Sequence, residues 1–167
     1  VIGNVGRLTE QKNPLFLLEI MRDLQADNSC LLWVGDGELR SDGKKVIEYG
    51  IRDKVIFTGA VTNPEDYYQA MDIFVMPSLY EGFPIAAVEA QCAGLPMVLS
   101  TQITDEADIM CETEWADINI SGRVKAISEI KGKNTKRKSN AVELQEKGYD
   151  MMTTVDFLQK FYITGKM

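Results

Sequence analysis

The sequence contains no histidine, and this absence limits the chemistry that the chain can carry by itself. A Ser-His-Asp triad and a histidine-ligated metal site are both excluded within these 167 residues. Cysteine is scarce as well. Cys30, Cys92 and Cys111 each stand alone in a predicted strand or helix, so we expect reduced side chains rather than a disulfide framework or a metal cluster.

Long apolar runs and an excess of positive charge are also missing. The apolar runs are all far shorter than a bilayer span, so no transmembrane helix is expected. The formal net charge of −7 disfavours nucleic acid as a partner. No signal peptide is visible, and residues 1–6 already have the pattern of a strand, so we expect a fragment or excised domain of a longer protein.

The residues that are present are typical of one globular α/β domain. A composition of 45% hydrophobic and 26% charged residues suits a chain of this length with a proper core. Short apolar runs predict strands at residues 1–6, 30–34, 55–58, 72–76 and 97–100. Helical patterns are found at residues 15–24, 46–50, 65–71, 84–93, 122–130, 141–147 and 153–163. Their alternation with the strands predicts a doubly wound, Rossmann-like parallel sheet with helices on both faces.

The pattern is weaker after Ser100. A strand-like piece occurs at residues 108–111, and residues 115–120 fit either a strand or the start of a helix. Residues 131–138 hold five positive charges, which predicts a solvated loop or helix start, with contact to a membrane surface as the alternative. The helix predicted at residues 153–163 is amphipathic, and its apolar face could drive self-association.

The stretch at residues 77–90 combines the features of an anion site. It follows a predicted strand, turns at Gly82 and enters a helix, with Pro84 suited to the first helical turn. Glu89 is the only charge in that helix, so its carboxylate needs a donor from the protein or from a ligand. Glu81 precedes the helix, whose free N–H groups attract anions. A diphosphate beside sugar hydroxyls fits this arrangement.

Further polar and glycine-rich segments follow the other predicted strands, at residues 6–12, 35–37, 59–62 and 100–101. Ligands bind at the carboxyl ends of strands in a doubly wound sheet, so we expect these segments to share one rim. Arg7 and Lys12 are natural partners of a diphosphate, because Arg presents a planar fork of donors and Lys a compact charge. Such cations, with a helix N-terminus, could replace a metal ion, and no D-x-D motif is present, so no metal cofactor is expected.

Residues 81–89, Glu-Gly-Phe-Pro-Ile-Ala-Ala-Val-Glu, resemble the E-x7-E signature of retaining glycosyltransferases with the two-domain GT-B architecture. Among these the chain is most similar to the family-4 group, which includes bacterial polysaccharide and lipopolysaccharide enzymes. Residues 6–8 and 12–14 match the same pattern, and residues 35–37 match the GDG turn of the family. The resemblance is strong from residue 1 to Ser100 and looser beyond.

The resemblance implies roles for individual residues. It implies catalytic roles for three residues: Arg7 and Lys12 would contact the diphosphate, and Glu81 would accept hydroxyls of the donor sugar. Glu89 would accept the ribose hydroxyls, and the loop around Val61 would meet the base. The nucleotide-sugar-binding residues implied in this way are Gly6, Arg7, Lys12, Gly35, Val61, Glu81, Gly82, Phe83, Pro84, Ile85 and Glu89.

The resemblance also implies an organisation. Residues 1–150 would form the donor-binding domain, the C-terminal half of a GT-B enzyme, and residues 151–167 a helix that packs back toward the N-terminal half. The substrates implied are a nucleotide-diphosphate sugar and a glycan or lipid-linked acceptor, with the enzyme cytoplasmic or peripheral at the inner face of the membrane. Because the other half positions the acceptor and excludes water, we expect this chain alone to bind nucleotide weakly and to transfer no sugar.

Three alternatives stay open at this point. A binding or regulatory α/β module without transfer chemistry would have the same fold, as would a nucleotide-sugar epimerase of the same architecture. A nicotinamide-dependent dehydrogenase is disfavoured, because the third glycine of a G-x-G-x-x-G that begins at Gly35 falls at Arg40 and no clear ribose-binding acid ends the second strand. Convergence of the four charged candidates on one cleft would favour transfer over the simple binding module.

Overall fold

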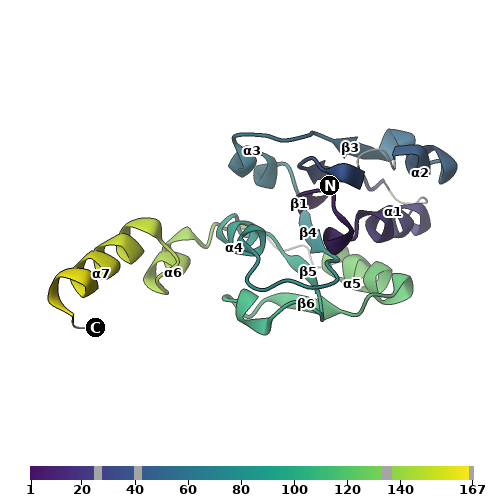
Figure 1. Ribbon diagram of the computed structural model, residues 1–167. Coiled ribbons are helices and arrows are strands. Elements are labelled where there is room, and N and C mark those ends of the chain that lie inside the picture. Colours follow the sequence, from purple (N-terminus) through teal and green to yellow (C-terminus); the bar gives the residue numbers. More distant parts are fainter. Residues whose placement is uncertain (25–27, 40–42, 133–136, 166–167) are drawn as a thin grey trace.

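A six-stranded parallel sheet forms the centre of the molecule (Figure 1). The computed structural model describes residues 1–24, 28–39, 43–132 and 137–165. The strands are β1 (Ile2–Val5), β2 (Leu31–Val34), β3 (Val55–Phe57), β4 (Ile73–Met76), β5 (Met97–Ser100) and β6 (Thr113–Ala116). Their order is β3-β2-β1-β4-β5-β6, and every neighbouring pair is parallel, which confirms the doubly wound sheet.

Helices cover both faces of the sheet (Figure 1). They are α1 (Pro14–Asp23), α2 (Gly43–Glu48), α3 (Pro64–Gln69), α4 (Ile85–Cys92), α5 (Ile120–Gly132), α6 (Ala141–Glu146) and α7 (Met151–Thr164), with short 3-10 turns at Glu10–Lys12, Arg52–Lys54 and Asp105–Ala107. Side chains of α1 and α5 belong to one buried cluster, and those of α3 and α4 belong to the other. The predicted helices and the first five predicted strands are therefore confirmed.

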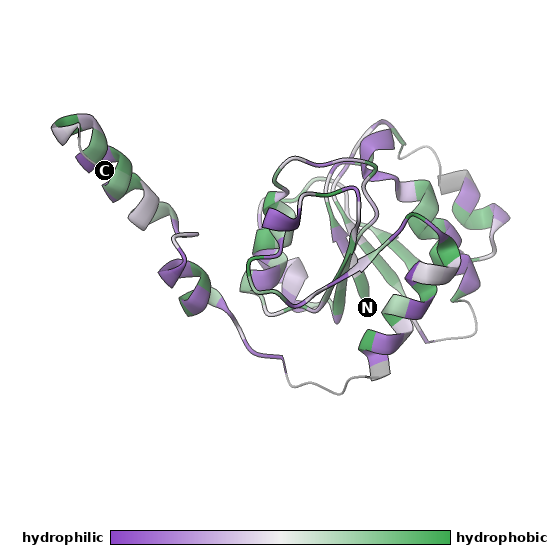
Figure 2. Cartoon of the chain, turned by 90° about the horizontal axis from the view of Figure 1, so that it is seen from below, coloured by the Kyte–Doolittle hydropathy of each residue, from purple (hydrophilic) through white to green (hydrophobic). Residues whose placement is uncertain are grey.

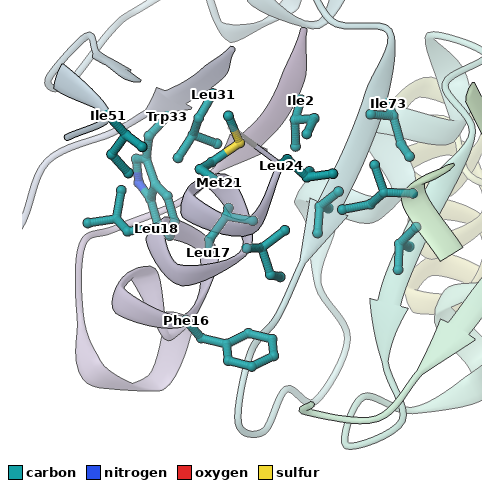
Figure 3. Packing of buried hydrophobic residues seen from close by; sticks show 14 of the residues in the cluster. Ile2, Phe16, Leu17, Leu18, Met21, Leu24, Leu31, Trp33, Ile51 and Ile73 are labelled. Carbon is teal, nitrogen blue, oxygen red and sulfur yellow. The ribbon is translucent and has the colours of Figure 1, made fainter. Parts of the chain in front are cut away.

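Alternation along the strands separates the two cores. Successive side chains of a strand point to opposite faces, so Leu31 and Trp33 of β2 join the α1 side while Leu32 and Val34 join the other. Figure 3 shows the first cluster, in which α1 packs its apolar stripe against the sheet. This stripe follows helical spacing, which is why the sequence pattern identified the helix.

The sixth strand lies later than the sequence pattern indicated. The strand predicted at residues 108–111 is wrong, because this segment is a turn in which Cys111 has a positive φ of 55°. The carboxylate of Asp108 accepts backbone N–H groups of Glu112 and Thr113 at 3.1 and 3.2 Å, and such local bonds compete with an extended chain. The ambiguous segment at residues 115–120 divides: β6 ends at Ala116, and α5 begins at Ile120.

Residues 131–138 were predicted to form a solvated loop or helix start, and among the described residues of this segment Lys131 and Lys138 are exposed while Arg137 is the exception. Residues 133–136 lie outside the described residues, but Arg137 is partly buried. Its guanidinium donates to the carbonyls of Tyr68, Gln69, Met71 and Ala93, at 2.9, 3.3, 3.0 and 2.7 Å. Arg137 therefore joins the end of α3 to the end of α4. The alternative of a membrane contact stays a prediction.

The C-terminal helices extend away from the sheet, as both views show (Figures 1 and 2). Every described residue of α7 is exposed, including large apolar side chains such as Val155, Phe157 and Ile163. Asp150 caps the helix by accepting from the backbone N–H of Thr153 at 2.8 Å. The apolar side of α7 is not covered by any other described part of the chain.

Candidate functional site

The carboxyl ends of β1 and β4 meet where the strand order changes direction, and the two loops that follow them are joined. The backbone N–H of Leu79 donates to the carbonyl of Gln11 at 2.9 Å, and the side chain of Gln11 donates to the carbonyl of Tyr80 at 3.0 Å. The Asn13 side chain donates to the carbonyl of Pro77 at 3.3 Å. In open α/β sheets the crevice at such a switch point is the usual ligand site.

Lys12 and Glu81 form an ion pair across these loops. The ammonium lies 2.5 Å from Oε1 of the carboxylate, and the side chains are only 17% and 11% exposed. Apart from this ion pair, Oε1 has no hydrogen-bond partner among the described residues. Asn13, in the left-handed region at φ 53°, ends the 3-10 turn that contains Lys12. The Lys12 side chain lies against Gly6, where a Cβ would be 3.3 Å from Cε of Lys12. The two predicted site residues Lys12 and Glu81 therefore lie in contact, and each neutralises the charge of the other.

Arg7 lies in the same loop but has a different environment. Its side chain is exposed, and it makes no hydrogen bond or ion pair with the part of the chain that the structure describes. The preceding Gly6 is held to β2, because its N–H donates to Val34 at 2.9 Å and its carbonyl accepts from the indole of Trp33 at 3.0 Å. Arg7 is thus a charge on a fixed backbone with its guanidinium available to a ligand.

The GDG turn packs against the β1 loop. Gly35 has φ +138°, and a Cβ there would lie 2.1 Å from the carbonyl oxygen of Gly6. A Cβ at Gly37 would lie 2.4 Å from the carbonyl oxygen of Leu8. Both glycines are therefore required by close packing at the rim, whatever contact a ligand makes. Val61, in the loop after β3, is half-buried against the second apolar cluster.

The start of α4 is open. Pro84 is the residue just before the helix rather than part of its first turn, and no side chain caps it. Nothing lies within 4 Å of the Cβ position of Gly82, and Phe83 and Ile85 are 42% and 69% exposed. The Phe83 ring stacks at 6.0 Å on that of Tyr149, from the segment between α6 and α7. The uncapped N–H groups of this helix start suit an anion.

Glu89 faces α3 one helical turn beyond Ile85. The Tyr68 hydroxyl donates to Oε2 of Glu89 at 2.7 Å and also approaches the carbonyl of Ala86 at 3.3 Å. Burial, and then this carboxylate, raise the pKa of Tyr68 far above its usual value, so the phenol stays a donor. The donor that Glu89 requires is therefore found within the protein, and a hollow of about 240 Å³ opens beside the pair.

Two further residues could not have been identified from the sequence. Tyr68 is one of six tyrosines, and no pattern marked it as the partner of Glu89. Arg123 is fully buried in α5, where its side chain donates to the carbonyl of Asp117 at 3.2 Å and approaches that of Met76, at the end of β4, at 3.5 Å. Burial lowers the pKa of Arg123 to about 10, against the opposing effect of Asp117.

Other features lie away from this rim. A larger hollow of about 460 Å³ lies at the opposite ends of the strands. It is lined in part by Val1, Asp72 and Pro96, which precede the central strands β1, β4 and β5. No three His, Cys, Asp or Glu residues gather as a metal site among the residues that the structure describes. None of the described helices is both long and apolar enough to span a bilayer.

Comparison with known proteins gives a consistent picture. A family model described as "Glycosyl transferases group 1" matches residues 1–129. The UDP-Gal:alpha-D-GlcNAc-diphosphoundecaprenol alpha-1,3-galactosyltransferase of Escherichia coli is 31% identical over an alignment of 180 positions, which covers 98% of this chain and 45% of that protein. The putative glycosyltransferase EpsF of Bacillus subtilis is 37% identical over 111 residues, 65% of this chain and 29% of EpsF. The chain thus spans less than half the length of these relatives.

A solved structure has the same fold. HepE of Anabaena in complex with UDP superposes with a TM-score of 0.83 at 16% identity, over 98% of this chain and 48% of the HepE chain. At this identity the likeness concerns the fold alone. The six-stranded sheet with its covering helices is therefore an arrangement also found in a UDP-bound protein.

Proposed function

Because the chain belongs to the group 1 family of glycosyl transferases, we propose that it is the donor-binding half of a retaining glycosyltransferase. The whole protein would transfer a sugar from a nucleotide-diphosphate sugar to a glycan or lipid-linked acceptor in polysaccharide biosynthesis. The E. coli relative is named for transfer from UDP-Gal to alpha-D-GlcNAc-diphosphoundecaprenol, a lipid-linked sugar, and HepE was solved with UDP. Both names support this class of substrates.

One observation carries the proposal. The loops after β1 and β4 are hydrogen-bonded to each other, and they bring Lys12 against Glu81 in the loop that leads into the uncapped start of α4. A diphosphate at this helix start would meet the helix dipole and the Lys12 ammonium, with Arg7 exposed in the same loop. A simple structural role for these residues does not require them to gather at the crevice of the switch point.

The chemistry that we propose follows from the charges. Cleavage of the sugar–phosphate bond leaves additional negative charge on the diphosphate, and Arg7 and Lys12 stabilise that charge more in the transition state than in the ground state. As Lys12 turns to the phosphate, Glu81 loses its cation and becomes free to accept hydroxyls of the donor sugar. With two cations and a helix start acting on the diphosphate, we propose that no metal cofactor is needed.

The acceptor side belongs to the part of the protein beyond this chain. We propose that α7 packs on that N-terminal half and that residues 1–150 form the donor domain. Acceptor positioning and exclusion of water need both halves, so this chain by itself should bind nucleotide weakly and transfer no sugar. We place the whole enzyme in the cytoplasm, attached peripherally to the inner face of the membrane.

Calorimetric titration tests the proposal. UDP, GDP and ADP would each be compared with NAD, and we expect one nucleoside diphosphate to bind. Arg7→Ala and Glu89→Gln should each weaken that binding about tenfold or more, because a charged hydrogen bond to the ligand is lost. Arg52→Ala is a matched control, since Arg52 is also exposed but precedes β3, at the amino end of that strand.

The outcomes separate the alternatives. Binding of NAD in place of a nucleoside diphosphate would overturn the proposal and favour a dehydrogenase. If Arg7→Ala and Arg52→Ala weaken nucleotide binding equally, Arg7 contributes only to the overall electrostatic potential of the protein and makes no direct contact with the ligand. With the full-length protein, transfer of the sugar to an acceptor with release of the nucleoside diphosphate distinguishes a transferase from an epimerase, which would return an isomeric nucleotide sugar.

A further inference from the structure

We propose that Tyr68 is a positioning residue, which holds the Glu89 carboxylate ready for the ribose hydroxyls of the donor nucleotide. The inference rests on the function proposed above, because it takes Glu89 as the ribose-binding group. Tyr68 itself would touch no ligand. Its effect would be carried by one hydrogen bond to Glu89, which distinguishes it from a residue that only fills the core.

The hydrogen bond leaves half of the carboxylate open. A phenol has one proton to donate, and Tyr68 gives it to Oε2 of Glu89 at 2.7 Å. Oε1 accepts no hydrogen bond from the residues that the structure describes. A carboxylate held by one oxygen can accept donors from a vicinal diol with the other oxygen and with the remaining lone pair of the first. Ribose presents such a diol.

The position of the Tyr68 hydroxyl is fixed by packing. The side chain is 2% exposed, and its ring lies 6.0 Å from that of Phe74 of β4, between ring centroids. A buried aromatic ring cannot follow a moving partner, so the carboxylate must come to the hydroxyl. Glu89, in contrast, is partly exposed and has a long side chain with several rotamers. Selecting one rotamer before binding removes an entropic cost from the binding step.

A second contact fixes the distance between the two helices. Arg137 donates to the carbonyl of Tyr68 itself at 2.9 Å and to that of Ala93, just after α4, at 2.7 Å. Its planar guanidinium therefore connects the helix that carries Tyr68 to the helix that carries Glu89. The Tyr68–Glu89 hydrogen bond is thus made between two elements whose spacing is set independently of it.

The place of Glu89 on α4 agrees with a ligand that extends from the start of this helix. Glu89 follows Ile85 by four residues, so both lie on the same side of the helix. A diphosphate at the helix start would then continue toward Glu89. The hollow of about 240 Å³ is lined by Tyr68 and Glu89 together with Glu65 and Cys92, and gives room beside the pair.

The experiment compares two ligands that differ only in the ribose hydroxyls. UDP and 2′,3′-dideoxy-UDP would be titrated into the full-length protein by calorimetry, with the base exchanged if the comparison above selects GDP or ADP. Wild-type protein should bind UDP about tenfold tighter than the dideoxy analogue. Tyr68→Phe should weaken UDP binding about fivefold and leave binding of the analogue within about twofold, so that the preference nearly disappears.

Tyr67→Phe is the matched control. Tyr67 is the neighbouring residue of α3, and its hydroxyl makes no hydrogen bond within the described part of the chain. It should leave the preference for UDP unchanged. If Tyr68→Phe does not fold, Tyr68→Met tests the same contact, because it fills the buried space with an apolar side chain, removes the hydroxyl that donates to Glu89 and leaves Glu89 itself unchanged, and it should also lose the preference.

Each result has a clear meaning. If Tyr68→Phe weakens UDP and the dideoxy analogue equally, or changes neither, Tyr68 has no positioning role and the inference fails while the proposed function stands. If the wild-type protein does not prefer UDP over the analogue, or if Glu89→Gln leaves the preference intact, the role of Glu89 itself is wrong. If no nucleoside diphosphate binds, the proposed function fails and the inference with it.

Discussion

Lys12 and Glu81 carry opposite charges that satisfy each other before any ligand arrives. Both side chains are largely withdrawn from water, so neither charge is well solvated if its partner is removed. This makes the pair an unusual combination of site and support. The same two groups that we propose for the diphosphate and the donor sugar also hold the β1 loop against the β4 loop.

The first prediction at this scale concerns stability. Lys12→Met should lower the free energy of unfolding in urea by about 1–3 kcal/mol, because it leaves the Glu81 carboxylate without its cation. The double variant Lys12→Met/Glu81→Gln should recover part of that loss, since the stranded charge is gone. A double variant no more stable than Lys12→Met would mean that the pair is not coupled in the folded protein.

The sequence was least informative about which side chains contact each other. The pattern singled out Arg7, Lys12, Glu81 and Glu89, but it did not indicate that Lys12 and Glu81 would contact each other. Such a contact depends on the left-handed turn at Asn13, which a single residue type does not specify. In the same way, the need of Glu89 for a donor was predictable, whereas the choice of Tyr68 depended on how α3 packs on α4.

At the scale of elements, Gly94 decides how the segment after α5 returns to the sheet. It has φ +70°, and a Cβ there would lie 1.8 Å from the carbonyl oxygen of Lys138. The adjacent Arg137 needs this close approach to reach the ends of α3 and α4. Gly94 thus has two roles: it follows the end of α4, and its lack of a side chain lets the backbone at Lys138 pass close to it.

A matched pair of substitutions separates strain from crowding. Gly94→Ala should destabilise the protein by about 3 kcal/mol or more, because backbone atoms must move apart. Gly148→Ala should cost about 1 kcal/mol, since Gly148 has φ +86° but nothing within 4 Å of its Cβ position. Urea unfolding of both variants gives the comparison, and equal losses would show that the contact with Lys138 does not matter.

Elements were predicted well wherever the local pattern matched the global packing. Strands β2 and β4 are continuous apolar runs because helices cover both faces of the sheet, and α1 shows a clear apolar stripe. The sixth strand reads Thr-Glu-Trp-Ala and is only half-buried, so its composition gave no apolar run to recognise. Its place was set by the turn at Asp108 and by pairing with β5, which are both features of the folded chain.

At the scale of the whole molecule, α7 is an amphipathic helix whose apolar side chains are exposed among the residues that the structure describes. Of the exposed large apolar side chains, Met151, Met152, Tyr162 and Ile163 are each at least 69% exposed. Exposed apolar surface of this kind favours association in water. We propose above that the N-terminal half covers it in the full-length protein, and in its absence other copies of the chain are the available partners.

Sedimentation measurements test this consequence. The 167-residue chain should associate as its concentration rises, whereas a chain ending at residue 150 should remain monomeric and unfold at nearly the same temperature. Leu158→Ser/Phe161→Ser in the longer chain should reduce association in the same way. Unchanged association after either modification would place the contact elsewhere on the surface.

The contact between Phe83 and Tyr149 has a practical consequence for anyone who exchanges domains among related enzymes. Phe83 belongs to the loop before α4, and Tyr149 belongs to the connection that leads into α7. A chimaera spliced just before residue 149 would import a foreign side chain against the donor loop, although the junction is distant in sequence from every glycine and charge of the site. A junction placed after Tyr149 would preserve the stacking of Phe83 on Tyr149 and leave the grafted helix as the only foreign part.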